Sequence, residues 1–251
     1  MRIDKYLAEK YGSRTKAAQA VERGLVLVNG KTVAVSYEVR GSDTITFAEE
    51  GLKFVSLGGY KLEKALNDFN FNVTDRIFAD IGASTGGFTD CLLQRGAKKV
   101  YCIDVGESQL DERLKSSKVV IIDNFNARNL HSELFEEEID GVVIDVSFIS
   151  LTYVLDKVAT VLSSGKSVLA LIKPQFECES RSVGKNGIVK EPKIHRRIIL
   201  KICEFAKGCG LSPQRLTTAP INKGKNIEYV ILLEKGAKSV DFEQLIKSVK
   251  L

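Results

Sequence analysis

Four charged residues stand where a purely structural role is hard to explain: Lys61, Asp145, Lys173 and Glu228. Of these, Glu228 fits a structural role equally well, and Lys61 alone would be unremarkable at a solvated helix end. Two of the four end the apolar runs 141–146 and 168–173, one opens the run 227–233, and the lysine at 61 begins a helical pattern. A charge beside a buried strand is costly unless it is paired or solvated, which favours a cleft. Two ammonium groups and two carboxylates can deprotonate a weakly acidic sugar alcohol without a metal. One lysine would be the base, the second would stabilise the alkoxide, and the carboxylates would orient both.

A glycine-rich turn gives the second chemical signal. The stretch 80–89 (DIGASTGGFT) closes one predicted strand and opens a helix, where glycines and free N–H groups let a polar ligand approach the backbone. The dinucleotide pattern G-x-G-x-x-G would need glycine where Ser84 stands. Asp104 ends the next strand, where a carboxylate can accept hydrogen bonds from ribose hydroxyls. This combination favours S-adenosylmethionine over a nicotinamide cofactor, and an ordinary turn of an α/β fold is the alternative.

Two further segments bear on the substrate and the donor. Enzymes that methylate base amino groups usually carry an Asx-Pro-Pro-aromatic turn after the fourth strand, and residues 145–148 read DVSF instead. No proline precedes a cysteine, as carbon-5 methylation of pyrimidines would need. The stretch 123–128 (DNFNAR) follows the third strand and could contact adenine, although a plain polar loop fits equally well.

Composition excludes several classes of protein. The chain has 251 residues, of which 44% are hydrophobic and 27% charged, which is typical of a folded protein rather than a disordered or fibrous one. No apolar run approaches the ~20 residues needed to cross a bilayer, and the charged start is unlike a secretory signal. Five cysteines without a C-x-x-C pair, and only two histidines, argue against zinc and disulfides and favour a reduced cytoplasmic protein. We expect both His131 and His195 on the surface.

The chain divides into a small and a large unit. Residues 1–50 predict two short helices (2–10 and 14–23), then strands at 25–28, 32–39 and 44–47, with Asn29-Gly30 as a hairpin turn. Residues 51–58 are predicted to be a linker. From residue 59 to 251, apolar strands alternate with helices, which indicates an α/β fold with a Rossmann-like, doubly wound parallel sheet covered on both faces. The expected strands are 77–81, 100–105, 119–122, 141–146, 168–173 and 227–233, and the expected helices are 60–69, 88–95, 150–162 and 193–207.

These motifs together resemble a known family over nearly the whole chain. Residues 2–7, 13–18 and 28–30 are similar to the small RNA-binding domain first described in ribosomal protein S4, and the remainder resembles FtsJ-type ribose methyltransferases. The stretches 59–62 (GYKL), 80–89, 145–151, 172–177 and 226–229 resemble the TlyA family, whose members also carry the name hemolysin. One departure is Gly-Gly-Tyr-Lys at 58–61, where the family often has Gly-Ala-His-Lys.

The resemblance implies 2′-O-methylation of cytidine in ribosomal RNA with S-adenosylmethionine as donor. It implies that the Lys-Asp-Lys-Glu catalytic set falls on Lys61, Asp145, Lys173 and Glu228, among which we expect Lys173 to be the base. It also implies a donor site made by Asp80, Gly82, Ser84, Thr85, Gly86, Gly87, Phe88, Thr89, Asp104, Asn126, Ala127 and Arg128. Because the chain begins almost at the first helix of the small domain, as short forms of the family do, we expect the large ribosomal subunit as substrate, with the small subunit possible.

Basic residues indicate where RNA would bind. The first 31 residues hold seven basic and three acidic residues, which is most of the net charge of +5, and residues 181–201 are also basic. Such contacts would be sensitive to salt and would carry little base specificity. Solvated faces are the alternative. The predicted RNA-binding residues are Arg2, Lys5, Arg14, Lys16, Arg23, Lys185 and Arg196.

Two other functions stay open at this stage. A membrane-active hemolysin would need an insertion segment, and the sequence shows none longer than a strand. A non-catalytic RNA-binding assembly factor is also compatible with the fold, although the intact set of two lysines and two acids argues against it.

Overall fold

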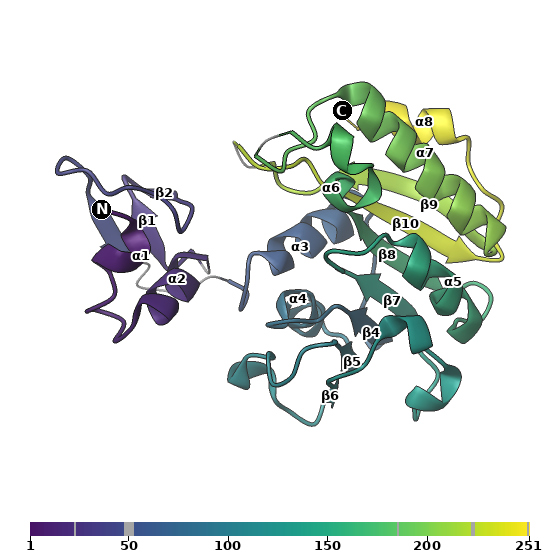
Figure 1. The fold of residues 1–251 in the computed structure, drawn as a ribbon. Coiled ribbons are helices and arrows are strands. Elements are labelled where there is room, and N and C mark those ends of the chain that lie inside the picture. Colours follow the sequence, from purple (N-terminus) through teal and green to yellow (C-terminus); the bar gives the residue numbers. More distant parts are fainter. Residues whose placement is uncertain (23, 48–52, 185, 222–223, 250) are drawn as a thin grey trace.

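The structure is a computed structural model, and it describes residues 1–251 except 23, 48–52, 185, 222–223 and 250 (Figure 1). The side chains of residues 16, 19 and 181 are also outside the description. The predicted RNA contacts Arg23 and Lys185 therefore lie outside the described residues, as do residues 51–52 of the predicted linker.

The small unit is built from two helices and a three-stranded antiparallel sheet in the order β2-β1-β3. Its elements are α1 (Ile3–Tyr6), α2 (Arg14–Glu22), β1 (Val26–Val28), β2 (Lys31–Thr32) and β3 (Ile45–Phe47). Asn29 and Gly30 both have positive φ and connect Val28 to its partner Lys31, as a two-residue hairpin requires. The predicted strand 32–39 is cut to two residues because the chain turns where the Tyr37 N–H donates to the Ala34 carbonyl.

A seven-stranded sheet with the order β6-β5-β4-β7-β8-β10-β9 forms the large unit. Five strands are parallel, as expected, but β10 runs antiparallel to both β8 and β9, so the sheet is mixed rather than all parallel. The edge strand β9 was not predicted. The strands are β4 (Ile77–Ile81), β5 (Lys99–Ile103), β6 (Val119–Ile122), β7 (Gly141–Ile144), β8 (Ser167–Ile172), β9 (Leu211–Thr218) and β10 (Tyr229–Lys235).

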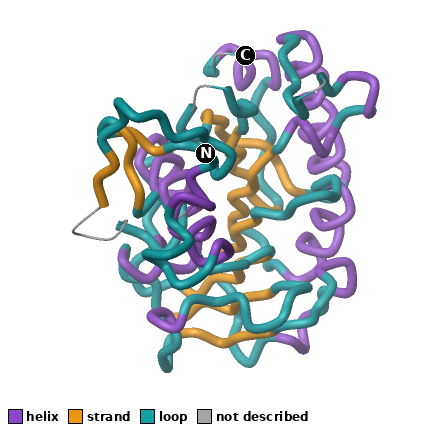
Figure 2. The backbone as a smooth tube through the Cα atoms, turned by 60° about the vertical axis from the view of Figure 1, so that its left-hand side comes forward, coloured by secondary structure: helices purple, strands orange, loops and turns teal. Residues whose placement is uncertain are grey.

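Helices cover both faces of this sheet (Figure 1). On one face α3 (Gly58–Asp68) and α4 (Gly87–Gln94) pack through leucines, phenylalanines and Cys91, and on the other α5 (Thr152–Val161), α7 (Pro192–Gly208) and α8 (Phe242–Lys247) pack through aliphatic residues. Figure 2 shows the small sheet and the long central sheet as separate sets of strands. The remaining short elements are α6 (Pro174–Glu177) and 3-10 helices at Glu112–Leu114, Ala127–Asn129, Ser132–Leu134 and Ser180–Ser182.

The strand order reverses between β4 and β7. The chain runs outward from β4 through β5 to β6, then returns to place β7 on the other side of β4. In open α/β sheets ligands bind at the carboxyl ends of the strands that flank such a switch point. Here those ends carry Gly82 after β4 and Asp145 after β7.

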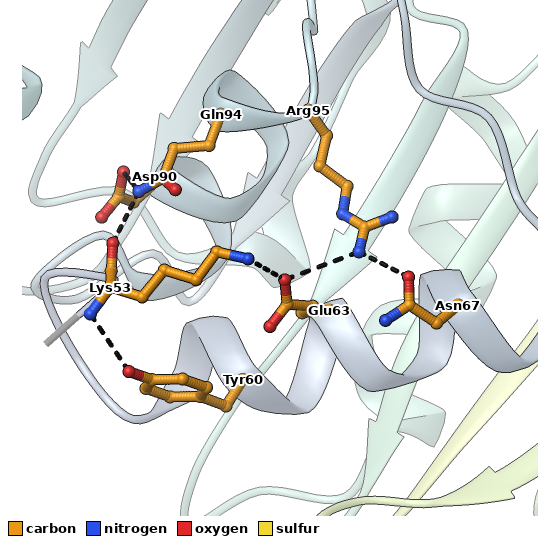
Figure 3. Close-up of polar contacts among 7 residues, drawn as sticks. All are labelled: Lys53, Tyr60, Glu63, Asn67, Asp90, Gln94 and Arg95. Carbon is orange, nitrogen blue, oxygen red and sulfur yellow. Dashed lines mark hydrogen bonds and ion pairs between the residues drawn. The ribbon is translucent and has the colours of Figure 1, made fainter.

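The segment that leads into α3 is held against α3 and α4 (Figure 3). The N–H of Lys53 donates to the Tyr60 hydroxyl at 3.1 Å, and the Gln94 amide donates to the Lys53 carbonyl at 2.7 Å. The N–H of Val55 donates to the Asp90 carboxylate at 2.8 Å. The described part of the predicted linker, 53–58, is therefore packed on the large unit.

Ion pairs reinforce the contact between α3 and α4 (Figure 3). The ammonium of Lys53 and the guanidinium of Arg95 both contact the carboxylate of Glu63, and Arg95 also donates to the side-chain oxygen of Asn67 at 2.5 Å. These contacts fix the position of α3, the helix that contains Lys61.

One prediction about histidine was wrong. His131 is exposed as expected, but His195 is only 1% exposed. Its Nε2 donates to the Val189 carbonyl at 2.9 Å, which leaves Nδ1 to accept from the Tyr229 hydroxyl at 2.8 Å. Both ring nitrogens are satisfied, so His195 is a structural residue between α7 and β10.

Candidate active site

Two adjoining cavities open at the carboxyl edge of the sheet. The larger, of about 640 Å³, extends from the start of α3 to the end of β8, and the smaller, of about 520 Å³, lies over the ends of β5 and β6. Gly82, Ser84, Asp145 and Ser147 line both. The shared lining makes a continuous site for a donor in one part and an acceptor in the other.

The structure brings together all four residues proposed for catalysis. They come from α3, from the ends of β7 and β8, and from the residue just before β10, and all four line the larger cavity. The Lys61 ammonium lies 2.6 Å from Oε2 of Glu228, and the Lys173 ammonium lies 2.6 Å from Oδ1 of Asp145. Lys173 is only 8% exposed, and Asp145 is the carboxylate with which it pairs.

Two further side chains hold this cluster and were not predicted. Lys173 donates to the Ser147 hydroxyl at 2.7 Å, and the Gln175 amide donates to Oε1 of Glu228 at 3.2 Å. Ser147 lies two residues after Asp145, in the loop that follows β7, and Gln175 lies two residues after Lys173, in α6. Both fall within the stretches 145–151 and 172–177 that carry the family resemblance, but no role was predicted for either from the sequence.

The electrostatics of Lys61 favour a permanently charged group. Burial alone lowers its pKa, but the carboxylates of Asp145 and Glu228 outweigh burial and raise the pKa above the ordinary value. A lysine with a raised pKa is protonated at neutral pH, so Lys61 suits stabilisation of negative charge rather than proton abstraction.

The glycine-rich turn fits closely under the end of β7. Gly82 has φ +81°, and a Cβ there would lie 2.7 Å from the main-chain oxygen of Asp145. Ser84 also has positive φ, and its N–H donates to Oδ2 of Asp104 at 2.8 Å, while the Gly106 N–H donates to Oδ1 at 2.8 Å. Asp104 is thereby oriented at the end of β5, where it lines the smaller cavity.

The smaller cavity combines apolar walls with a few polar groups. Its apolar side chains include Ile103, Val105, Phe125 and Ile149, and it has two carboxylates, Asp104 at the end of β5 and the shared Asp145. Flat apolar walls suit a purine ring, and an oriented carboxylate at the strand end suits ribose hydroxyls. The residues present therefore fit the adenosine part of S-adenosylmethionine.

The predicted loop after β6 also lines the smaller cavity, through Asn126, Ala127 and Arg128. The Asn126 side chain accepts from the Arg128 N–H at 3.0 Å and so caps a short 3-10 helix. The Arg128 guanidinium lies over the ring of Tyr153, 4.4 Å from its centroid. Both side chains thus have partners within the protein, which holds the cavity wall in place.

Three residues predicted to contact the donor, Asp80, Gly86 and Thr89, line neither cavity. Asp80 is fully buried, and its Oδ2 accepts from the Thr89 hydroxyl at 2.7 Å. Burial raises the pKa of Asp80 to about 7, helped by the nearby charge of Asp145 and opposed by the hydrogen bond from Thr89. Period-two alternation puts Asp80 on the same face as Phe78, beneath α4, where its carboxylate holds Thr89 of that helix.

Gly86 also has a structural reason to be glycine in this turn. It has φ +92°, and a Cβ there would lie 2.3 Å from a side-chain carbon of Leu114. Thr85, Gly87 and Phe88, by contrast, line the larger cavity as expected.

Several residues of the cavity walls were not among the predicted site residues, although Tyr60, Ala83 and Asn226 lie within the motif stretches 59–62, 80–89 and 226–229. Around the larger cavity these are Ser56, Leu57, Gly58, Tyr60, Ala83, Pro220, Lys225 and Asn226. Around the smaller cavity they are Gln109 and Phe148 together with the apolar side chains named above.

The predicted RNA-binding residues differ in the ion pairs that their side chains form within the protein. In the small unit, Arg2 and Arg14 both contact the buried carboxylate of Asp4, at 3.1 Å and 2.8 Å. Lys5 is exposed, and Lys16 lies on α2 although its side chain is not described. In the large unit Arg196 pairs with Glu243 of α8. Arg2 and Arg14 are therefore held together by one shared carboxylate, whereas Arg196 is held by a partner on another helix.

Two absences concern only the described part of the chain. No helix in it is long and apolar enough to cross a membrane. Nor does it contain a group of three or more His, Cys, Asp or Glu side chains that could hold a metal ion.

Comparison with known proteins decides the family. A model of the FtsJ-like methyltransferases matches residues 54–235, and a model of the S4 domain matches residues 1–45. The chain belongs to the FtsJ-like methyltransferase family. It is a methyltransferase whose donor is S-adenosylmethionine, and the resemblance to the TlyA family seen in the sequence is confirmed.

Relatives and a solved structure cover nearly the whole chain. A Brachyspira hyodysenteriae protein named hemolysin A is 42% identical over 92% of this chain and 98% of its own length. A Mycobacterium tuberculosis protein named 16S/23S rRNA (cytidine-2′-O)-methyltransferase TlyA is 37% identical over 88% of this chain and 84% of its own. A structure described as a hemolysin from Streptococcus thermophilus is 38% identical, covers 99% of this chain and 94% of that one, and has a TM-score of 0.77.

Proposed function

We propose that this protein transfers a methyl group from S-adenosylmethionine to the 2′-hydroxyl of a cytidine in ribosomal RNA, with the large subunit as preferred substrate. The observation that carries the proposal is the pairing of Lys61 with Glu228 and of Lys173 with Asp145 beside the donor cavity. The name of the Mycobacterium tuberculosis relative supports cytidine in ribosomal RNA as substrate. The name of a Campylobacter jejuni relative that is 32% identical, 23S rRNA (cytidine-2′-O)-methyltransferase TlyA, supports the preference for the large subunit.

The division of labour within the cluster follows from its contacts. When bound, the donor supplies an electrophilic methyl group and a positive charge. Lys173 is the base and takes the proton of the 2′-hydroxyl on its Nζ, while Asp145 and Ser147 hold that nitrogen in place. Lys61 remains charged and stabilises the negative charge that develops on the hydroxyl oxygen, and Glu228 with Gln175 orients it.

The base must be neutral when the hydroxyl arrives. A second ammonium, that of Lys61, also interacts with Asp145, so two cations compete for the same carboxylate. Lys173 is the more buried of the two lysines, and its Nζ is held between Asp145 and Ser147, so it is the group we propose as the base.

Two units would divide recognition from chemistry. We propose residues 1–50 as an RNA-binding domain and residues 59–251 as the catalytic domain, with 51–58 between them, of which 53–58 pack on the catalytic domain. The basic residues of the small unit, above all Arg2 and Arg14, would contact phosphates, and ribosomal RNA or a ribosomal subunit is the partner. A substrate of that kind implies action in the cytoplasm.

The test compares two lysine–aspartate pairs on the same two strands. Lys173 and Asp145 pair at the carboxyl ends of β8 and β7, whereas Lys166 and Asp140 pair at 2.7 Å at the opposite ends. Radiolabelled methyl transfer to purified large and small subunits is measured for wild type, Lys173→Ala, Asp145→Ala and Lys166→Ala. We expect the first two variants to lose at least ~10²-fold in rate while still binding donor in calorimetry, and Lys166→Ala to match wild type. Wild-type activity in Lys173→Ala would refute the mechanism.

The alternative functions make opposite predictions in simple assays. The Brachyspira relative is named hemolysin A, and a membrane-active protein would release dye from liposomes. We expect the pure protein to release none. A non-catalytic assembly factor would bind ribosomal RNA without transferring methyl groups. Transfer by wild type and loss in Lys173→Ala would exclude that function.

A further inference from the structure

A buried glutamate joins the two loops that carry Asp145 and Lys173. Glu177 is the last residue of α6, and its side chain is only 2% exposed. Its Oε2 accepts from the Ser150 hydroxyl at 2.6 Å, and its Oε1 accepts from the Leu151 N–H at 2.7 Å. One carboxylate thus links the loop after β8 to the loop after β7.

The bridge continues into the start of α5. The Ser150 oxygen accepts from the Thr152 N–H at 3.2 Å and lies 2.8 Å from the Thr152 hydroxyl, and Thr152 is the first residue of that helix. The Glu177 carboxylate therefore lies at a helix N-terminus, where negative charge is favoured. The loop after β7 is fixed at its far end by this contact, and at its near end by the Asp145 N–H, which donates to the Ile81 carbonyl at 3.0 Å.

A second contact links the same two loops nearer the solvent. The rings of Phe148 and Phe176 lie 5.1 Å apart in a tilted arrangement. Phe148 has φ +66°, a backbone conformation that an aromatic residue keeps only when its surroundings impose it. The direct contacts of Lys173 with Asp145 and Ser147 lie in these same loops.

The buried carboxylate of Glu177 has hydrogen-bond and charged partners, and Glu177 does not line either cavity. The Lys201 ammonium of α7 lies 3.7 Å from Oε2 and donates to the Glu177 main-chain oxygen at 3.4 Å. Burial raises the pKa of Glu177, although both hydrogen bonds oppose this. The residue lines neither cavity, so an effect on the reaction would have to act through the loops.

We propose that Glu177 is a positioning residue that sets the placement of Asp145 relative to Lys173. Contacts of 2.6 and 2.7 Å between the two loops leave little tolerance, and a displacement of about 1 Å in a reacting group can cost ~10²-fold in rate. The proposal rests on the proposed function only in taking Asp145 and Lys173 as the catalytic pair.

The first test is the kinetics of Glu177→Ala and Glu177→Gln. We expect Glu177→Ala to lower kcat by about 10²-fold, with KM for the ribosomal subunit and the Kd of the donor changed less than about threefold. Glutamine keeps an acceptor for the Leu151 N–H, and its amide can donate to the Ser150 oxygen. Glu177→Gln should therefore recover most of kcat, which a requirement for the charge itself would not allow.

Two more variants separate positioning from general destabilisation. Ser150→Ala removes one of the two bonds, and the double variant Ser150→Ala/Glu177→Ala should have the kcat of Glu177→Ala alone, because both changes break the same bridge. Glu204→Ala, at an exposed glutamate of α7, is the matched control and should keep wild-type kcat. Thermal unfolding of each variant identifies any that do not fold, and the glutamine and Ser150 variants then carry the test.

The second test does not depend on methyl transfer. Hydrogen exchange of the protein without RNA should speed up in Glu177→Ala for peptides covering both 145–152 and 173–178, and return toward wild type in Glu177→Gln. If wild type transfers no methyl to ribosomal RNA, the proposed function fails and this readout still tests the bridge. Unchanged kcat in Glu177→Ala, equal loss in the alanine and glutamine variants, or faster exchange in only one of the loops would overturn the proposal.

Discussion

The α-carbon of Gly82 faces the main-chain carbonyl of Asp145 so closely that a Cβ on residue 82 would lie 2.7 Å from that oxygen. This contact sets the glycine-rich turn of the proposed donor site against the loop that carries Asp145, the proposed catalytic carboxylate. The two halves of the site, donor turn and acceptor cluster, are therefore mechanically connected through backbone atoms that cannot move aside as a side chain could.

A pair of glycine substitutions tests that contact. Gly82 and Gly165 have nearly the same φ, +81° and +79°, but a Cβ at Gly165 would have nothing within 4 Å. Both alanine variants carry a backbone strain of about 1 kcal/mol, and Gly82→Ala adds overpacking of about 1–3 kcal/mol. We expect Gly82→Ala to unfold at lower temperature than Gly165→Ala and to weaken donor binding at least ~10-fold, measured by calorimetry. Equal behaviour of the two variants would mean that the turn tolerates displacement.

The role of Asp104 is tested against its neighbour on the next strand. Asp104 follows β5 and Asp123 follows β6, and each accepts a main-chain N–H, but only Asp104 lines the smaller cavity. Asp104→Ala should weaken binding of S-adenosylmethionine by ~10-fold or more, because ribose hydroxyls lose a charged acceptor. Asp123→Ala should leave the Kd within a few-fold. If Asp104→Ala leaves the Kd of the donor unchanged, the ribose of the donor does not bind the Asp104 carboxylate.

Asp80 gives a prediction about pH. Its pKa of about 7 in the folded protein lies above the ordinary 3.8, so the folded state binds the proton more tightly than the unfolded chain. Wild type should therefore lose stability relative to Asp80→Asn as pH rises from about 4 to about 7, by up to ~4 kcal/mol, and the difference should level off above that range. The free energies of unfolding of both proteins across pH 4–8 check this. A difference that does not vary with pH would show that Asp80 keeps its ordinary pKa.

Salt dependence tests the RNA contacts of the small unit. If Arg2 and Arg14, held by Asp4, each contact one phosphate, the double alanine variant should bind ribosomal RNA more weakly and reduce the slope of log K against log salt by about 2. Lys98, which pairs with Glu137 at the amino end of the sheet, is the control. Filter binding over a range of salt concentrations measures the affinity and the slope for each variant. An unchanged slope in the double variant would mean that RNA binds another surface of the protein.

The sequence was sufficient for the parallel part of the sheet and for the residues at its carboxyl edge. The runs 77–81 and 119–122 coincide with β4 and β6, because continuous apolar strands bounded by polar turns are distinctive. Charged residues at the ends of such strands have to meet at one edge, and Asp145 and Lys173 do. The pairing of Lys61 with Glu228, 167 residues apart, followed from family resemblance rather than from local pattern.

Elements that depend on distant partners escaped the sequence analysis. The edge strand β9 contains Pro213, Gln214 and Arg215 and is recognisable only through its pairing with β10. His195 is buried because a tyrosine and a carbonyl from other segments satisfy its ring. The inward position of Asp80 could have been found from strand alternation, since it shares a face with Phe78, but the glycine motif beside it pointed to the donor instead.

The most direct test of the central claim is a map of 2′-O-methyl groups in ribosomal RNA. RNA is compared from cells that carry the gene, cells that lack it, and deleted cells that express wild type, Lys173→Ala or Lys166→Ala. The account predicts that a methylated cytidine of the large-subunit RNA loses its mark on deletion and regains it with wild type and Lys166→Ala but not with Lys173→Ala. An identical methylation map with and without the gene would contradict it.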